Sequence, residues 1–292
     1  MSPTAARSRS AQLATPLRKI TELRGQMAAW RAAGETIGLV ATMGALHAGH
    51  LALVARARAE CDRVVATLFV NPKQFNDPAD LDSYPADEAD DAARFAEAGV
   101  DLLFAPAVSE MYPDGFATAV SVAGLTDCLC GAARPGHFDG VATLVAKLFN
   151  QAPADRAYFG EKDYQQLLVV RRMARYLDLP IRVVAVPTVR EADGLALSSR
   201  NRGLTPDQRR AAPRLYETLA ALAARLAGGT VAAPELARGR DDLARAGFDR
   251  VDYLDLRDGG TLAALDRAAP GARLFAAAEL GDIRLIDNLA VA

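Results

Sequence analysis

The sequence contains few of the residues that form covalent or metal cross-links, and it carries almost no excess charge. Among 292 residues there are three cysteines and three histidines, and the formal net charge is −2. An odd, sparse set of cysteines gives no disulfide framework and suggests a reducing compartment, so we expect a cytoplasmic protein. A net charge so small gives no general attraction to nucleic acid or to an anionic membrane, and we expect neither partner.

Long hydrophobic runs are also missing. No apolar stretch approaches the roughly 18 residues that a membrane-spanning helix requires. Residues 1–14 are polar and carry arginines without an apolar segment, so we expect a loose tail rather than a secretion signal. Hydrophobic residues nevertheless make up 51% of the chain, which is typical of a globular protein with an ample core.

Two clusters have the residue types of a metal site but favour a simpler interpretation. Cys128 and Cys130 could be half of a zinc site, but no second cysteine or histidine pair has ligand spacing, so we expect buried or idle thiols. Four acidic residues precede a helical pattern: Asp87, Glu88, Asp90 and Asp91. Acidic side chains favour a helix N-terminus, so we expect a solvated face there, with a magnesium site as the alternative.

Over the first two thirds of the chain, apolar runs alternate with helical patterns. The expected strands are Ile37–Val40, Arg63–Val70, Asp101–Phe104, Arg156–Phe159 and Ile181–Val186. The expected helices are Pro16–Ala33, Gly49–Glu60, Ala86–Gly99, Val141–Asn150 and one that ends at Tyr176. Trp30 belongs to the apolar stripe of the first helix, where we expect it to fill the core. The alternation predicts an α/β fold with a Rossmann-like, doubly wound parallel sheet.

Beyond Leu204 the pattern changes. Two amphipathic helices are expected, over Asp207–Leu226 and Pro234–Ala246. Short strands follow: Val251–Leu256, Arg273–Ala278 and Ile283–Ile286. Helices followed by strands indicate a separate, small α+β domain. We therefore expect a Rossmann-like domain over residues 1–188 and a smaller C-terminal domain over 189–292.

A glycine-bearing loop, Met43–His50, joins the first expected strand to a helix. This arrangement directs unpaired backbone N–H groups and the positive end of the helix dipole at the sheet edge where anions bind. Gly44 and Gly49 leave room for a phosphate near the backbone. His47 and His50 are three residues apart, so on one helical turn both imidazoles share a face and could stabilise phosphate charge. Helix capping is the alternative.

Polar side chains follow the second strand and precede a later helix. Asn71, Gln74 and Asn76 offer uncharged hydrogen-bonding groups at the same edge of the sheet. Tyr84 fits a ligand cover or a surface turn equally well. His137, beside Arg and Gly residues, fits a structural role or a place in the site equally well.

Two further loops carry charge. After the fourth strand, Lys162 could contact phosphates and Asp163 a ribose or a metal, with a surface ion pair as the alternative. Gln165 and Gln166 on the following turn are candidate substrate contacts. Ser198–Arg200 supplies two hydroxyls and a guanidinium after the last strand of the sheet, which suits a triphosphate and the departing pyrophosphate. A small exposed loop would explain the serines equally well.

Five motifs taken together carry a family resemblance. They are Met-Gly-Ala-Leu-His-x-Gly-His at 43–50, Phe-Val-Asn-Pro-x-Gln-Phe at 69–75, Arg-Pro-Gly-His-Phe-x-Gly-Val at 134–141, Phe-Gly-Glu-Lys-Asp-Tyr-Gln-Gln at 159–166 and Leu-Ser-Ser-Arg-Asn at 197–201. In this order the chain resembles the pantothenate synthetase (pantoate–β-alanine ligase) family of the class I nucleotidyltransferase and aminoacyl-tRNA synthetase-like superfamily. The resemblance implies a two-step ligase. Pantoate and ATP with Mg²⁺ would give pantoyl adenylate and pyrophosphate, and β-alanine would then displace AMP.

The resemblance also implies roles for individual residues. His50, His47 and Lys162 would be catalytic, with His50 the proton donor, while Gln74 and Gln166 would bind pantoate and Gln74 also β-alanine. The ATP site would comprise Met43, Gly44, Ala45, Leu46, His47, Ala48, Gly49, His50, Gly160, Glu161, Lys162, Asp163, Val189, Leu197, Ser198, Ser199 and Arg200. Leu197 replaces a methionine of some members, which conserves volume. The metal ligands are not implied, and family membership suggests a homodimer.

Two other functions share part of this pattern. A nucleotidyltransferase acting on a phosphate substrate would carry the same histidine loop but would need more basic groups than Gln74 and Gln166 provide. A non-catalytic ATP-binding module would not need those glutamines.

Overall fold

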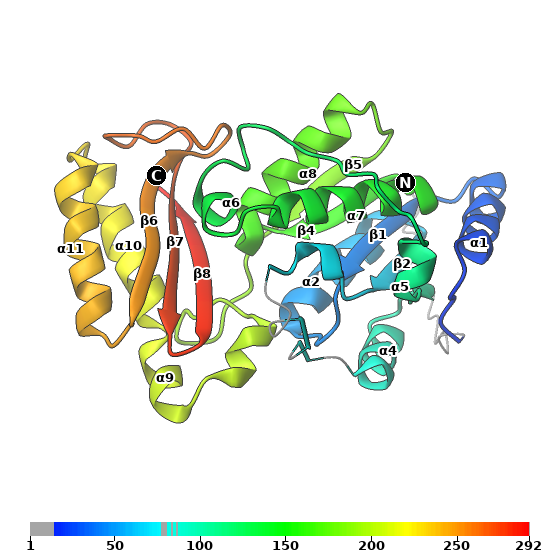
Figure 1. The fold of residues 1–292 in the computed structure, drawn as a ribbon, viewed down its shortest axis with the longest axis horizontal. Helices are drawn as coiled ribbons and strands as arrows, with labels where there is room; N and C mark the ends of the chain where they lie inside the picture. Colours follow the sequence, from blue (N-terminus) through cyan, green and yellow to red (C-terminus); the bar gives the residue numbers. More distant parts are fainter. Residues whose placement is uncertain (1–14, 77–80, 83, 86, 292) are drawn as a thin grey trace, which may run out of the picture.

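The first part of the molecule is built on a five-stranded parallel sheet (Figure 1). Its strands are β1 (Ile37–Thr42), β2 (Arg63–Leu68), β3 (Leu102–Phe104), β4 (Arg156–Gly160) and β5 (Arg182–Val186). The structure is a computed structural model that describes residues 15–76, 81–82, 84–85 and 87–291, so the expected tail at 1–14 lies outside the described residues. The expected α/β fold class is confirmed.

The order of the strands in this sheet is β3-β2-β1-β4-β5. β1 pairs with β2 on one side and with β4 on the other, so the chain proceeds outward in both directions from the β1–β4 pair. In open parallel sheets, ligands bind at the carboxyl ends of the strands at such a reversal of strand order. The loops that follow β1 and β4 therefore lie side by side at the expected position of a site.

Helices cover both faces of the sheet. They are α1 (Ile20–Ala32), α2 (Ala48–Glu60), α4 (Glu88–Glu97), α5 (Val108–Met111), α6 (Leu129–Ala133), α7 (His137–Gln151) and α8 (Tyr164–Tyr176). Successive strand residues point to opposite faces: Leu39 packs in the core formed with α1, α7 and α8, whereas Val40 packs against α2 and α4. Trp30 is buried in the first of these cores, as expected.

The second part contains a three-stranded antiparallel sheet in the order β6-β7-β8. Its elements are α9 (Pro206–Ala211), α10 (Arg214–Ala227), α11 (Ala232–Arg245), β6 (Arg250–Asp258), β7 (Ala272–Leu280) and β8 (Ile283–Ala290). Leu219 and Leu222 of α10 are fully buried with Leu274 of β7 in a hydrophobic cluster of its own. The expected smaller α+β unit is thereby confirmed.

Several helix boundaries differ from the expectation, and α1 starts at Ile20, four residues after the expected Pro16. A single helix over 207–226 is wrong, because α9 ends at Ala211 and α10 starts after Pro213; proline lacks the N–H that a continuous helix needs and its ring clashes with the preceding turn. α7 starts at His137, four residues before the expected Val141. No helix among the described residues is long and apolar enough to cross a membrane.

Candidate active site

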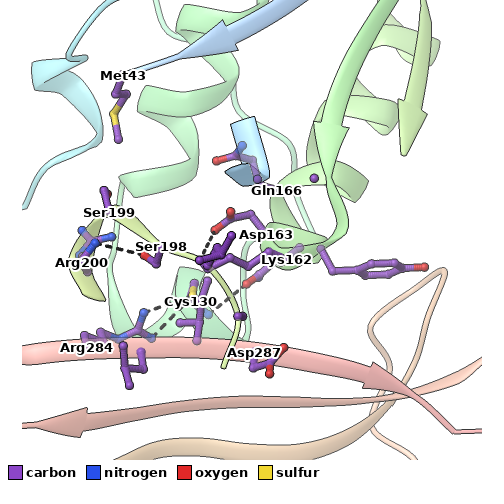
Figure 2. Close-up of a pocket in the computed structure, with 18 of the residues that line it drawn as sticks. Met43, Cys130, Lys162, Asp163, Gln166, Ser198, Ser199, Arg200, Arg284 and Asp287 are labelled. Atoms are coloured by element: carbon purple, nitrogen blue, oxygen red, sulfur yellow. Dashed lines mark hydrogen bonds and ion pairs between the residues drawn. The ribbon is translucent and has the colours of Figure 1, made fainter. Parts of the chain in front are cut away.

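A cavity of about 870 Å³ opens at the carboxyl ends of the parallel strands, between the two sheets. Both parts of the chain line it (Figure 2). The predicted site residues that line it are Met43, His47, Gly49, His50, Gln74, Gly160, Lys162, Asp163, Gln166, Val189, Leu197, Ser198, Ser199 and Arg200. The predicted ATP-site residues that do not line it are Gly44, Ala45, Leu46, Ala48 and Glu161. Segments more than a hundred residues apart in sequence thus meet in one cavity.

The two histidines of the first loop are held by hydrogen bonds to neighbouring backbone. His47 is the N-cap of α2, and its Nδ1 accepts from the Gly49 N–H at 3.1 Å. The Nδ1 of His50 accepts from the His47 N–H at 3.3 Å, and the two ring centroids are 4.1 Å apart. Since Nδ1 is the acceptor in both neutral rings, the proton is on Nε2. Both imidazoles can therefore donate through Nε2. The histidines cap the helix and also lie beside each other, so the two expectations for this loop hold together.

Burial keeps both imidazoles neutral. Desolvation, followed by the nearby positive charge of Lys162, lowers the pKa of His47 to about 4. Desolvation and then His47 lower the pKa of His50 to about 3. A neutral imidazole still donates a hydrogen bond, so these side chains can stabilise developing negative charge without carrying a full charge themselves.

A buried carboxylate from α4 anchors this loop. Asp91 is 2% exposed, and its two oxygens accept from the N–H groups of Ala45 and Leu46 at 2.8 Å each. The expected solvated face is therefore wrong for Asp91, although Asp90 is exposed and pairs with Arg94. Asp91 lies four residues before the buried Phe95 and so shares its helix face, and this spacing could have predicted from the sequence that Asp91 is buried.

The expectation of unpaired N–H groups in this loop is also wrong at several positions. Those of Ala45 and Leu46 bind Asp91, and those of His47 and Gly49 bind the imidazoles. The glycines make room for protein groups: a Cβ on Gly44 would lie 2.7 Å from Asp91 Oδ2, and one on Gly49 would lie 2.8 Å from the His47 ring. A phosphate at this loop would therefore meet side chains rather than a backbone cradle.

Lys162 is held in place by the second part of the chain. The short 3-10 turn η2 (Glu161–Asp163) follows β4, and Asn288 of β8 donates to the carbonyls of Glu161 and Lys162 at 2.9 Å each. The Lys162 side chain is 19% exposed, with its Nζ 3.7 Å from Asp163 Oδ1. The ion pair named as the alternative is therefore present, with Asp163 exposed, and both residues also line the cavity (Figure 2).

Gln74 lies on the 3-10 turn η1 (Pro72–Gln74) after β2. His137 Nδ1 donates to its carbonyl at 2.7 Å, and Arg134 donates to the same oxygen at 3.2 Å. Asn71 is buried and donates to the Gln74 side chain at 3.0 Å and to the Gly140 carbonyl at 3.1 Å. His137 thus both lines the cavity and positions Gln74; desolvation lowers its pKa to about 4. Asn76 instead donates to the Pro135 carbonyl.

The two glutamines that start α8 behave differently. Both line the cavity. Gln165 is buried, donates to the carbonyls of Leu125 and Cys128 at 2.8 Å each, and accepts from the Cys130 N–H at 3.0 Å. Both of its amide N–H groups and one acceptor position thus hold the loop before α6, which gives Gln165 a structural role; a substrate contact stays a prediction.

The serine–arginine segment faces these groups from the 3-10 turn η3 (Ser199–Gly203). Ser198 Oγ accepts from the Arg200 N–H at 3.3 Å, as Figure 2 shows. Tyr84 bonds to the Ser199 side chain, and desolvation raises the pKa of Tyr84; this tyrosine lines the cavity. Arg202, which sequence reasoning missed, donates to the Leu46 carbonyl at 3.0 Å and links this segment to the histidine loop.

The cysteines do not form a site. Cys61, Cys128 and Cys130 are free thiols. Among the described residues no three His, Cys, Asp or Glu side chains gather as a metal site. Cys130 is buried with its Sγ 3.1 Å from Tyr253 Oη, in agreement with a structural thiol.

The fold and the cavity together define an α/β enzyme with a histidine pair at the switch point of a parallel sheet, opposite a lysine and a serine–arginine segment. A family model for pantoate-beta-alanine ligase matches residues 15–290. A pantothenate synthetase of Roseobacter denitrificans is 57% identical over 275 residues, which cover 94% of this chain and 97% of the relative. The chain belongs to the pantoate-beta-alanine ligase family.

Solved structures agree. The crystal structure of pantothenate synthetase from Thermus thermophilus matches with a TM-score of 0.88 at 52% identity, covering 95% of this chain and 99% of that chain. That of pantoate-beta-alanine ligase from Francisella tularensis, complexed with beta-gamma ATP and beta-alanine, matches with a TM-score of 0.80 at 31% identity, covering 95% and 98%. The resemblance inferred from the five motifs is confirmed, and the two other functions lose their support.

Proposed function

We propose that this enzyme joins pantoate to β-alanine at the expense of ATP, through a pantoyl-adenylate intermediate. The observation that carries the proposal is the neutral histidine pair, which lies in one cavity with Lys162, the Ser198–Arg200 segment and the two glutamines Gln74 and Gln166. A carboxylate does not react with an amine, and adenylation supplies the leaving group that it lacks.

In the first step, a pantoate carboxylate oxygen attacks the α-phosphorus of ATP, and the bond to pyrophosphate breaks. His47 and His50 donate through Nε2 to phosphate oxygens as negative charge develops there. Lys162 and Arg200 supply the positive charge that the departing pyrophosphate requires. The chain forms no covalent bond to the substrate, and its contribution is positioning together with charge stabilisation.

In the second step, the β-alanine nitrogen attacks the acyl carbon, the acyl–oxygen bond to AMP breaks, and the amine loses a proton. Gln74 and Gln166 provide amide groups that can hydrogen-bond the hydroxyls and carboxylate of pantoate, and Gln74 would also meet β-alanine. The bonds from His137 and Arg134 to the Gln74 carbonyl support this role, because they fix the backbone that presents the side chain.

ATP is expected to arrive with magnesium. Mg²⁺ usually keeps several waters and binds through one or two carboxylates plus substrate phosphates, so it needs no dedicated protein cage. Asp163, which lines the cavity beside Lys162, is the carboxylate we assign to the ion or to the ribose. Bound there, Mg²⁺ would neutralise phosphate charge.

Three further proposals concern the whole chain. We place the domain boundary between residues 188 and 189, supported by the separate hydrophobic cluster that begins at Leu195. We propose a homodimer on the basis of family membership, which sedimentation equilibrium can test. A cytoplasmic location, with neither nucleic acid nor membrane as a partner, stays a prediction from composition.

The experiment is exchange of labelled pyrophosphate into ATP. Exchange should require pantoate and should not require β-alanine, because it reports the first step alone. Exchange that is absent with pantoate, or that needs a phosphate-bearing substrate instead, would overturn the proposal. A binding module would bind ATP without any exchange.

A further inference from the structure

We propose that Asp91 is a positioning residue for the reaction, acting through the histidine loop rather than on a ligand. This inference rests on the proposed function for its kinetic readout. Asp91 is not among the residues that line the cavity. Its carboxylate lies behind the loop, almost completely buried, where a formal negative charge is costly unless hydrogen bonds compensate it.

Two successive backbone N–H groups of the histidine loop bind the Asp91 carboxylate. The N–H groups of Ala45 and Leu46 point at the two oxygens of one carboxylate. Gly44 has a φ of +95° and Ala45 a φ of +53°, so two consecutive residues are left-handed. A non-glycine residue adopts this conformation at a cost, and the surrounding structure must hold it there. The Asp91 carboxylate supplies that hold from inside the protein.

The anchor lies directly before the histidine pair. Leu46 donates to Asp91, and its carbonyl accepts from Arg94 at 3.2 Å and from Arg202 at 3.0 Å. Both polar groups of Leu46 are therefore fixed. The next residue, His47, caps α2, and its N–H donates to the Nδ1 of His50. If the backbone at Leu46 were no longer fixed, the Nε2–H groups of His47 and His50 would no longer be held in one direction.

The test compares Asp91→Ala and Asp91→Asn with Glu97→Gln, an exposed carboxylate on the same helix. At a temperature where all variants are folded, we expect both Asp91 variants to lose about 10- to 100-fold in kcat for pantoate-dependent pyrophosphate exchange. The KM for pantoate should change less than kcat, because the backbone of Gln74 is held by His137 and Arg134 rather than by Asp91. Glu97→Gln should match the wild type.

Formate provides the decisive control. In Asp91→Ala the removed carboxylate leaves space in which formate can accept the same two N–H groups, so formate should restore exchange in that variant. It should not restore Asp91→Asn, whose amide fills the space. Wild-type kcat in both variants, or a loss that formate does not reverse in Asp91→Ala, would overturn the inference.

A second readout is independent of catalysis. The chain has three histidines, so NMR can follow each imidazole. In Asp91→Ala the pKa of His47 and of His50 should rise toward the ordinary value, while that of His137 should not change. Unchanged titration of all three would contradict the inference. If the wild type lacked pantoate-dependent exchange while these titrations moved, the proposed function would fail and the positioning role would stand.

Discussion

The two loops that face each other across the cavity are held in opposite ways. The histidine loop, residues 43–50, is tied within its own half of the molecule by Asp91 and by the two imidazole caps. The serine–arginine segment, residues 197–203, has Ser198 bonded to its own backbone and reaches the other half through Tyr84 and Arg202. One loop is preorganised, whereas the other depends on the opposite half of the molecule for its position.

This difference matches the chemistry of each side. Neutral donors stabilise a transition state only if their direction is fixed before the reaction, because they carry no long-range attraction. Arginine and serine side chains must admit a triphosphate and release pyrophosphate, so a segment with fewer internal ties suits them. We therefore expect substitutions in the first loop to affect the chemical step, and substitutions under the second to affect stability or nucleotide binding.

The largest effect is expected at Arg190, which lies ahead of the second segment in the chain. Arg190 forms a bidentate pair with Asp287 of β8 at 2.6 and 2.9 Å, and the Asp287 side chain is 2% exposed. Arg190→Ala would leave that carboxylate buried without its partner and should lower the free energy of unfolding by about 3–5 kcal/mol. Urea denaturation measures this change.

Arg210 provides the matched control, because its pair with Asp207 is exposed on both sides. Arg210→Ala should change stability by less than about 0.5 kcal/mol. Equal losses for the two variants would show that the second segment has no special anchor at its base.

The next effect concerns the first loop. His50→Ala should raise the activation free energy of pyrophosphate exchange by about 2–4 kcal/mol, the loss expected for one transition-state donor. The unfolding transition should move little. His50→Gln retains a neutral N–H donor and should recover part of the rate. An alanine variant with unchanged turnover would remove His50 from the mechanism.

The sequence predicted the sheet and most helices because their apolar residues recur with the period of a strand or a helix, as in Arg63–Leu68 and α2. The sequence also predicted that most of the cavity residues lie close together, because the carboxyl ends of parallel strands share one edge of the sheet. The break at Pro213 was readable and was missed, because the strong apolar stripe of 207–226 outweighed one proline.

Other features depend on contacts between distant segments. Asp91 and Gln165 look like surface or substrate-binding residues until the loops they hold, at 45–46 and 125–130, are placed beside them. The proton positions of the two imidazoles follow from bonds of 3.1 and 3.3 Å, which no spacing rule supplies. A sequence thus predicts which loops meet, but not which side chain in each loop is used for support.

A smaller effect is expected from replacing a left-handed glycine by alanine, and it should be larger at Gly44, which contacts Asp91, than at Gly229, which has no neighbour there. Gly44→Ala would force a φ of +95° on alanine and bring its Cβ to 2.7 Å from Asp91 Oδ2. The backbone conformation alone should cost about 1–2 kcal/mol of stability, and the contact adds to it. Gly229→Ala meets nothing within 4 Å at a φ of +78°, so it should incur the backbone cost only. Pyrophosphate exchange should fall in Gly44→Ala and not in Gly229→Ala.

The last effect is that of pH, and it should act through the buried imidazoles and not through the serine–arginine segment. Unfolded imidazoles bind a proton near pH 6.5, whereas burial lowers the pKa of His47 to about 4 and that of His50 to about 3. Between these values the unfolded state holds more protons, so the free energy of unfolding should fall as the pH drops below about 6.5 and should not change above it on their account. Arginine does not titrate in this range, so the second segment should contribute nothing.

Denaturation of the wild type and of His50→Gln across this range measures the contribution of one imidazole. The variant should lose less stability on acidification than the wild type, because glutamine binds no proton in either state. The kcat/KM for ATP should likewise show no break near pH 6.5, since the free enzyme already holds both rings neutral there. A break at that pH that disappears in His50→Gln would mean that the ring is solvated and charged before ATP binds, and the preorganised loop would lose its physical basis.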